Sequence, residues 1–197
     1  MMKIRIPKIF VYLSLMATGI FFGCAEEEEP NRVLAQASLS RVANITDTTY
    51  SIGSEVAGTA TVESLERGVR LNILVQGLTP NSRHAVHIHL GSCEAPGAHW
   101  NQASEESFCE AMSLGVTWAR PKAGDVGNVN TDAQGNGALT IETDLWSVGS
   151  GDEKDIMGAV IIVHERGEEF LDHCFSNHTH VHDANAKIAC GMIEGQL

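Results

Sequence analysis

The sequence is poor in positive charge, in aromatic side chains and in cysteine. Among its 197 residues, 13 Lys and Arg stand against 25 Asp and Glu, and the formal net charge is −12. That balance does not suit binding to nucleic-acid phosphates. Five Cys are too few for a small scaffold built from disulfides. With 43% hydrophobic residues the chain is not of the disordered class, and one core of ordinary size is expected.

The N-terminus has the features of an export signal. Basic residues in the first eight positions precede an apolar segment, Ile9–Phe22, that is too short to span a bilayer stably. Gly23 and Cys24 follow it, so residues 1–23 are expected to be a signal peptide. A small residue directly before a cysteine is similar to a bacterial lipoprotein signal, which implies an acylated Cys24 that anchors the protein to a membrane. Ordinary secretion, with Cys24 near the cleavage point, is the alternative.

A run of glutamates and a proline follow Cys24. Residues 24–35 are therefore expected to be an acidic, lipid-anchored tether, and residues 36–197 to be the folded domain. Export places the protein in the bacterial periplasm or cell envelope, where the compartment is oxidising. The cysteines beyond the tether suffice for two disulfides there: Cys93, Cys109, Cys174 and Cys190.

The rest of the chain predicts short strands and no helix. Runs of alternating polarity are separated by turn residues, which is typical of an antiparallel all-β sandwich or barrel. Eight strands are expected: Arg41–Ile45, Glu55–Glu66, Val69–Val75, His84–Leu90, Gly127–Thr131, Gly137–Thr143, Ile156–His164 and Lys187–Ile193. Two long segments interrupt them, residues 91–124 and 165–186, and loops of that length are usually functional or cross-linked.

Nine histidines are the main compositional oddity. His87 and His89 lie two residues apart on an expected strand, so both imidazoles project from one face and can share a metal ion. His99 follows the turn at Cys93, and His164 ends an apolar strand. Each of these taken singly is as well explained by a solvated surface residue. Together, three or four neutral imidazoles suit copper.

Six segments, in order along the chain, resemble the copper/zinc superoxide dismutase family in its bacterial exported form. They are residues 84–89 (HAVHIH), 91–93 (GSC), 97–99 (GAH), 124–128 (GDVGN), 163–165 (VHE) and 189–194 (ACGMIE). The resemblance covers roughly residues 40–195. It implies an eight-stranded Greek-key β-barrel with two long active-site loops. It also implies the conversion of superoxide to oxygen and hydrogen peroxide.

The resemblance further implies a set of site residues. Copper would be bound by His87, His89, His99 and His164, and a Cys93–Cys190 disulfide would tie the active-site loop to the last strand. In the family, the histidine at the His99 position binds copper through one ring nitrogen and exchanges that bond for a proton during the reaction. Its other ring nitrogen binds zinc.

The family's zinc site is incomplete in this sequence. Asp125 matches its aspartate and His99 its bridging histidine, but residues 100–124 contain no histidine. Lys122 stands where a zinc ligand is usual, and an ammonium group cannot bind a metal. The spacing of other candidates, Glu105, Glu106, Glu110, His178, His180 and His182, gives no closed ligand set. We therefore expect a copper-only relative without zinc, in which His99 needs another partner on its far nitrogen.

The long loops contain two further features. Cys109 lies in one and Cys174 in the other, so a second disulfide could order both loops in place of zinc. The second loop also contains His173, His178, His180 and His182. These either capture copper or zinc for delivery or merely decorate an exposed loop.

Two positions near the expected site depart from the family. Lys187 stands where the family has an arginine that guides superoxide, and lysine keeps the charge but loses the planar two-pronged donor geometry. Reduced activity is therefore expected. Glu168 stands where an aspartate braces a copper-ligand histidine; it either plays that part or is a solvated loop acid. The alternative function is a non-enzymatic copper-binding or copper-buffering lipoprotein. The sequence gives no oligomeric state.

Overall fold

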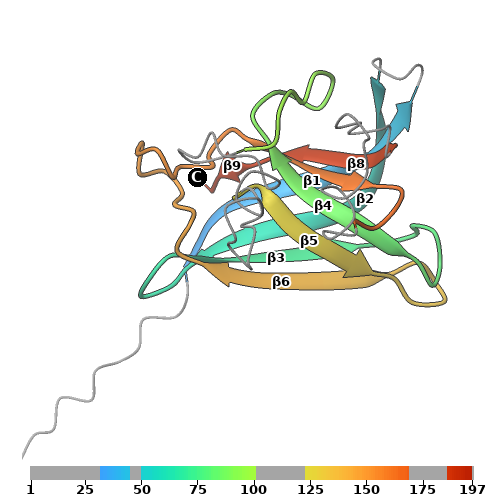
Figure 1. The fold of residues 1–197 in the computed structure, drawn as a ribbon, viewed down its shortest axis with the longest axis horizontal. Coiled ribbons are helices and arrows are strands. Elements are labelled where there is room, and N and C mark those ends of the chain that lie inside the picture. The colour runs from blue at the N-terminus through green and yellow to red at the C-terminus, as the bar shows by residue number, and fades with distance from the viewer. Residues whose placement is uncertain (1–31, 45–49, 101–122, 169–185, 197) are drawn as a thin grey trace, which may run out of the picture. The chain divides into compact units, whose positions relative to one another are not determined.

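The regular structure consists of strands. The structure, a computed structural model, describes residues 32–44, 50–100, 123–168 and 186–196. Within those ranges every regular element is a strand: β1 (Val33–Asn44), β2 (Tyr50–Ser64), β3 (Val69–Val75), β4 (Arg83–His89), β5 (Asp125–Asn130), β6 (Gly137–Thr143), β7 (Val160–His164), β8 (Lys187–Met192) and β9 (Glu194–Gly195) (Figure 1). The predicted all-β class is confirmed. In the same ranges, no helix has the length and apolarity needed to cross a bilayer.

The strands form one antiparallel sheet that curls into a nearly closed barrel. Eight of them follow the order β5-β4-β7-β8-β1-β2-β3-β6, and β9 pairs with β1 (Figure 1). The β4–β7 and β3–β6 pairings each skip intervening strands, which is the Greek-key pattern. A bridge between Thr131 and Gly137 connects the ends of β5 and β6, the two strands at the ends of this order. The Greek-key barrel implied by the sequence resemblance is confirmed.

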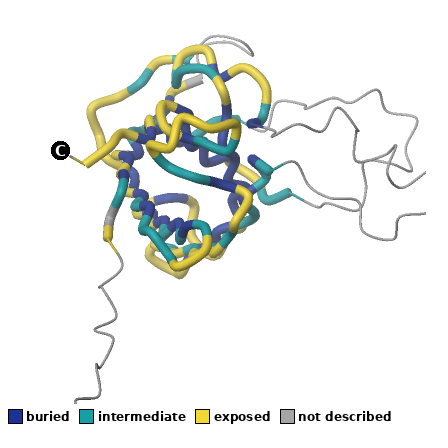
Figure 2. Tube along the Cα trace, turned by 90° about the vertical axis from the view of Figure 1, so that its left-hand side faces the viewer, coloured by how far each residue is buried: buried dark blue, intermediate teal, exposed yellow. Residues whose placement is uncertain are grey.

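Alternation along the strands separates an inner from an outer layer. On β3, the buried residues Val69, Leu71, Ile73 and Val75 alternate with more exposed ones and belong to the barrel core. Figure 2 shows the buried stretches of the chain lining the inside of the barrel. Each fully buried aliphatic side chain of this size contributes about 1.5–3 kcal/mol to folding.

β7 is buried on both faces. Its inward side chains, Ile161 and Val163, belong to the barrel core, whereas Val160 and Ile162 belong to a separate cluster. We call this second group the outer cluster; it comprises Val42, Val160, Ile162 and Cys190, with Tyr50, Ile52 and Cys93 packed against it. Because its β7 members alternate with the inward side chains, the outer cluster lies on the outside of the barrel.

The first hairpin is longer than predicted. β1 begins at Val33, earlier than both the strand start expected at Arg41 and the domain boundary expected at residue 36. Ala35 is 0% exposed and pairs with Gly195, so this stretch belongs to the folded domain. β2 begins at Tyr50 rather than Glu55. Within the described residues, β2 pairs with β3 only from Gly58 onward, so the first part of β2 pairs with β1 alone.

The strand expected to begin at Ile156 begins only at Val160. A turn replaces its first residues, and Gly158 has a φ of 80°, a conformation that glycine adopts without strain. The Asp155 carboxylate accepts hydrogen bonds from the backbone N–H groups of Gly149, Gly151 and Met157. These bonds hold the chain in a loop just before β7.

Candidate metal centre

β4 presents two histidines on the outside of the barrel. Val86 and Ile88 face the core, so the alternating residues His87 and His89 face outward. Both imidazoles are nevertheless buried, since the chain that follows β4 folds back over them.

The third histidine is brought in by that return of the chain. His99 forms a bridge with His89, and the Trp100 N–H donates a hydrogen bond of 2.8 Å to the Ile88 carbonyl. Gly124 then packs beside this segment: its N–H donates to the Trp100 carbonyl, and a Cβ there would lie 2.6 Å from the carbonyl oxygens of Ile88 and Trp100. Only glycine allows so close an approach, so the fixed position of His99 depends on it.

The fourth histidine, His164, ends β7 and is also buried. Its Nε2 lies 3.1 Å from the Nδ1 of His87. A fifth histidine, His84, is fully buried, and its Nδ1–H donates a hydrogen bond of 3.0 Å to the His164 carbonyl. His84 lies an even number of residues from Val86 and Ile88, so its strand position alone places it inward. No role was predicted for it.

The four outward-facing imidazoles converge. One ring nitrogen each from His87, His89 and His99 lies within 4.8 Å of the others. The ring centroids of His87 and His99 are 4.1 Å apart, those of His89 and His99 are 4.6 Å apart, and those of His87 and His164 are 4.8 Å apart. The predicted copper ligands therefore meet at one place, although they come from β4, β7 and the segment between β4 and β5. We call them the histidine centre.

In three of these rings, one nitrogen is committed to an oxygen acceptor. His87 Nε2–H donates to Glu168, His99 Nδ1–H donates to Asp125 at 2.7 Å, and His89 Nδ1–H donates to the Gly97 carbonyl at 3.1 Å. Such bonds fix the tautomer, so the lone pair resides on the opposite nitrogen. Each ring is thus prepared to donate that lone pair to a metal.

His89 gives the clearest sign that the site fits a metal. Its Nε2 is buried and, among the described residues, has no hydrogen-bond partner. A buried polar atom without a partner is costly, and a metal ion would satisfy it. Burial, reinforced by the nearby His99, lowers the pKa of His89 to about 3. The imidazole is therefore neutral at physiological pH, which is the form that binds metals.

Hydrogen bonds to its backbone hold Glu168 beside the histidine centre. The Asn128 side chain makes two hydrogen bonds with it: Nδ2–H donates to the Glu168 carbonyl at 3.0 Å, and Oδ1 accepts from the Glu168 N–H at 2.8 Å. Burial alone would raise the pKa of Glu168, but the hydrogen bond and attraction from His87 lower it overall. The group is thus a carboxylate bonded to a ring of the histidine centre rather than a solvated loop acid.

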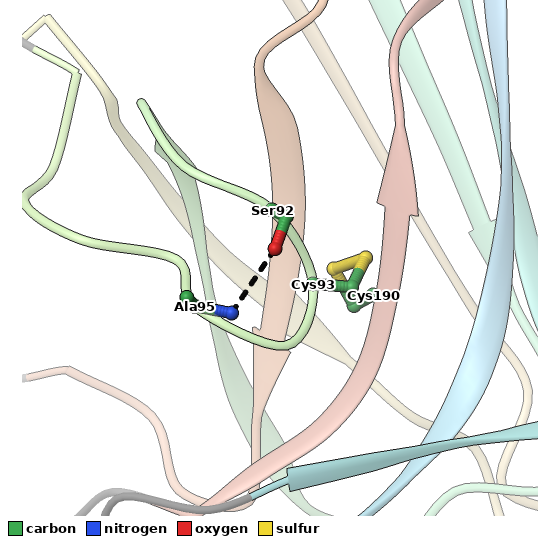
Figure 3. Close-up of a disulfide and its surroundings, with 4 residues drawn as sticks. All are labelled: Ser92, Cys93, Ala95 and Cys190. Carbon is green, nitrogen blue, oxygen red and sulfur yellow. Dashed lines mark hydrogen bonds between the residues drawn. A yellow bond between two sulfur atoms is a disulfide. The ribbon is translucent and has the colours of Figure 1, made fainter.

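A disulfide joins Cys93 to Cys190, with Cα atoms 5.7 Å apart across a sequence separation of 97. Figure 3 shows the turn that carries Cys93 lying beside β8, where a hydrogen bond of 3.2 Å from the Ala95 N–H to Ser92 Oγ closes it. Cys190 belongs to the outer cluster and Cys93 packs against it, so the bond fastens the loop that leads to His99 onto the barrel.

Lys187 is the first residue of β8 and pairs with His164, after a register shift that leaves Ile188 between this pair and the Val163–Ala189 pair. Its ammonium group donates a hydrogen bond of 2.8 Å to the Tyr50 hydroxyl oxygen. Seven other predicted site residues lie outside the described residues: Cys24, Cys109, Cys174, His173, His178, His180 and His182. Lys122 lies outside them as well.

A family model described as copper/zinc superoxide dismutase (SODC) matches residues 56–193. The chain belongs to the copper/zinc superoxide dismutase family. It is 26% identical over 143 residues to a Cu-Zn superoxide dismutase of Aquifex aeolicus, a match that covers 71% of this chain and 80% of that one. It is 29% identical over 149 residues to the Cu-Zn superoxide dismutase of Schizosaccharomyces pombe, covering 71% and 90%.

Solved structures show the same fold. A mutant of a SOD-like protein from Bacillus subtilis superposes with a TM-score of 0.59 at 22% identity, covering 81% of this chain and 97% of that one. At that identity the likeness concerns the barrel alone.

Asp125 has a contact that the sequence does not predict, because its position matches only the aspartate of the family's zinc site. Here its carboxylate bonds directly to the far nitrogen of His99.

Proposed function

We propose that this protein converts superoxide to oxygen and hydrogen peroxide at a single copper ion bound by His87, His89, His99 and His164. The observation that carries the proposal is the buried Nε2 of His89, which has no hydrogen-bond partner among the described residues and lies where His87, His89 and His99 converge. Nitrogen donors of this number and type suit copper. The family's shared chemistry supplies the substrate class.

Copper, when bound, supplies a one-electron redox couple that oxidises one superoxide and reduces the next. The protein's own groups hold and orient the ligands. Glu168 keeps the proton of His87 on Nε2, and the Gly97 carbonyl keeps that of His89 on Nδ1. Because these protons are fixed, the opposite nitrogens remain available throughout turnover.

The contact between Asp125 and His99 supports a centre without zinc. If His99 binds copper through Nε2, its Nδ1 needs another partner, and Asp125 Oδ1 lies 2.7 Å from Nδ1. A carboxylate there holds the ring orientation and retains the proton on Nδ1. The bond thus gives His99 an electrostatic hold that does not require a second metal, and we propose a copper-only centre.

We also propose export and membrane anchoring. The basic start, the apolar segment and the Gly23–Cys24 pair support a lipoprotein signal in residues 1–23. A disulfide between Cys93 and Cys190 fits the oxidising periplasm or cell envelope. Acyl chains on Cys24 would hold the protein to the membrane. Mass spectrometry of the mature N-terminus tests the anchoring: a diacylated or triacylated Cys24 supports it, and a cleaved N-terminus without acyl chains contradicts it.

A copper-buffering lipoprotein is the second candidate. Lys187 in place of arginine favours it, because a single ammonium group orients an anion less well than a guanidinium. Such a protein needs the histidine centre but no substrate guidance.

One experiment separates the two functions. The purified protein is loaded with one equivalent of copper, and superoxide decay is followed for the wild type and for His164→Ala. His178→Ala serves as the control, because its histidine-rich segment binds copper adventitiously if it binds at all. Decay that requires His164 but not His178 supports dismutation. Stoichiometric copper without His164-dependent decay supports buffering, and absence of copper binding contradicts both.

A further inference from the structure

Tyr50 contacts Lys187 in two ways. The Lys187 Nζ donates a hydrogen bond of 2.8 Å to the tyrosine hydroxyl oxygen, and the same nitrogen lies 4.0 Å from the centroid of the phenol ring. The first is a hydrogen bond from a charged donor, and the second is a cation–π interaction. Both act on one ammonium group, so they restrain it together. No sequence motif pointed to Tyr50.

The strand register places this pair beside the histidine centre. Lys187 is the partner of His164 across β7 and β8, just beyond a register shift at Ile188, and paired residues of two antiparallel strands project from the same face. Tyr50 packs on the outer cluster. Two members of that cluster, Val160 and Ile162, lie two residues apart on β7, and His164 follows at the same spacing, so all three side chains face outward. Lys187 on β8 thus pairs with His164 on β7 and also contacts Tyr50 on β2, which lies on the other side of β8 in the strand order.

A lysine in this position needs support that an arginine does not. Its ammonium group is a point charge on a flexible chain with four rotatable bonds, whereas a guanidinium presents its donors in a rigid planar fork. The phenol ring and its hydroxyl oxygen limit where that charge can go. Tyr50 is in turn held by its packing in the outer cluster, next to the disulfide-bonded Cys93 and Cys190.

We propose that Tyr50 is a positioning residue that holds the Lys187 ammonium group at the rim of the histidine centre and so sets the affinity of the site for small anions. The inference rests on the proposed function, because attraction of an anion by Lys187 serves the protein only if its substrate is superoxide. In this proposal Tyr50 acts through Lys187, with which it makes the two contacts described above. Two predictions separate its role from mere support of the fold.

The first test needs no metal. Competitive acetylation of the metal-free protein, followed by peptide mapping, measures the reactivity of the Lys187 amine. Tyr50→Phe removes the hydrogen bond and keeps the ring, so reactivity should rise about two- to fivefold, and Tyr50→Ala should raise it further. Ile52→Ala is the matched control, since Ile52 lies on the same strand in the same outer cluster. Equal reactivity in the Tyr50→Ala and Ile52→Ala proteins would overturn the proposal.

The second test measures anion binding. Azide, a small monovalent anion, is titrated optically into the copper-loaded protein at low ionic strength. Tyr50→Phe should weaken azide binding about two- to fivefold. The same change in a Lys187→Met background should have no effect, because Tyr50 acts only through the ammonium group that Lys187→Met removes. A loss of equal size in both backgrounds would contradict a role through Lys187.

The outcomes keep the two proposals distinguishable. If superoxide decay depends on His164 but azide affinity is indifferent to Tyr50→Phe, the positioning role is wrong and the activity stands. If azide affinity follows Tyr50 and Lys187 but superoxide does not decay, the positioning role stands and the proposed activity is wrong.

Discussion

Replacing Glu168 by glutamine tests how the protein holds its proposed copper ligand His87. The carboxylate accepts a hydrogen bond from His87 Nε2, and the two side chains are only 20% and 7% exposed. Glutamine has nearly the same size and keeps a carbonyl oxygen at that position, but it removes the negative charge. The His87 ring therefore keeps its orientation and loses the anion that makes its Nδ1 a stronger donor.

The expected loss can be bounded. Removing a group that braces a metal-bound histidine lowers metal affinity by about 10- to 100-fold, or about 1.4–2.7 kcal/mol. The shielding of this pair from water favours a clear effect, since screening is weak there. Because the glutamine oxygen still accepts a hydrogen bond, we expect a loss of about tenfold for Glu168→Gln and one nearer 100-fold for Glu168→Ala.

The assay is competition for Cu(II) with a chromophoric chelator at neutral pH. Glu165→Gln is the matched control, because it removes the same charge from an exposed position in the same segment. Asn128→Ala should give a smaller loss than Glu168→Gln, since it releases only the two hydrogen bonds that hold the Glu168 backbone. Equal copper affinity in the Glu168→Gln and Glu165→Gln proteins would refute the assigned role.

Three further predictions concern other parts of the molecule. Asp125→Asn should lower copper affinity about tenfold in the same competition assay, because His99 loses its charged acceptor; an unchanged affinity would contradict this. Ile161→Ala, at a position 0% exposed in β7, should cost about 2–5 kcal/mol in urea unfolding, and a loss below about 1 kcal/mol would contradict its place in the core. Asp155→Asn should cost about 1 kcal/mol at pH 7, because the carboxylate accepts three backbone N–H groups. Burial alone would raise the pKa of Asp155, but these bonds lower it overall, so its contribution is present above about pH 4 and is lost as the pH falls through the folded pKa. Unfolding of both proteins at pH 7 and at pH 3 should therefore show the difference shrinking, and a constant difference would contradict the assignment.

The barrel was largely predictable from alternation where the side chains are large. Val69–Val75 shows the period of two plainly, and its bounds in β3 match the prediction. The start of β1 was hidden because its inward residues, Ala35 and Ala37, are small and give a weak hydrophobic signal. The start of β2 was not recognisable because Gly53 and Ser54 interrupt its pattern, although the strand continues through them and pairs with β1 on either side, at Ile52 and Val56.

The convergence of His87, His89, His99 and His164 was predictable from the sequence, whereas most of the contacts that orient their rings were not. The spacing of His87 and His89 was visible in the sequence, and the family motifs supplied His99 and His164. The bonds that orient these rings depend on which residues face each other across strands. Asn128 contacts Glu168, and Tyr50 contacts Lys187 over a separation of 137 residues, only because the Greek-key order brings them together. Nothing in the local pattern of either partner indicates such a contact.

The central claim is that imidazoles from separate parts of the chain bind one copper ion. Frozen-solution electron paramagnetic resonance of the protein with one equivalent of Cu(II) tests it most directly. We predict a single Cu(II) species with nitrogen hyperfine coupling that His89→Ala alters and His178→Ala leaves unchanged. A spectrum that is insensitive to His89→Ala but lost in His178→Ala would place the metal elsewhere and contradict the account.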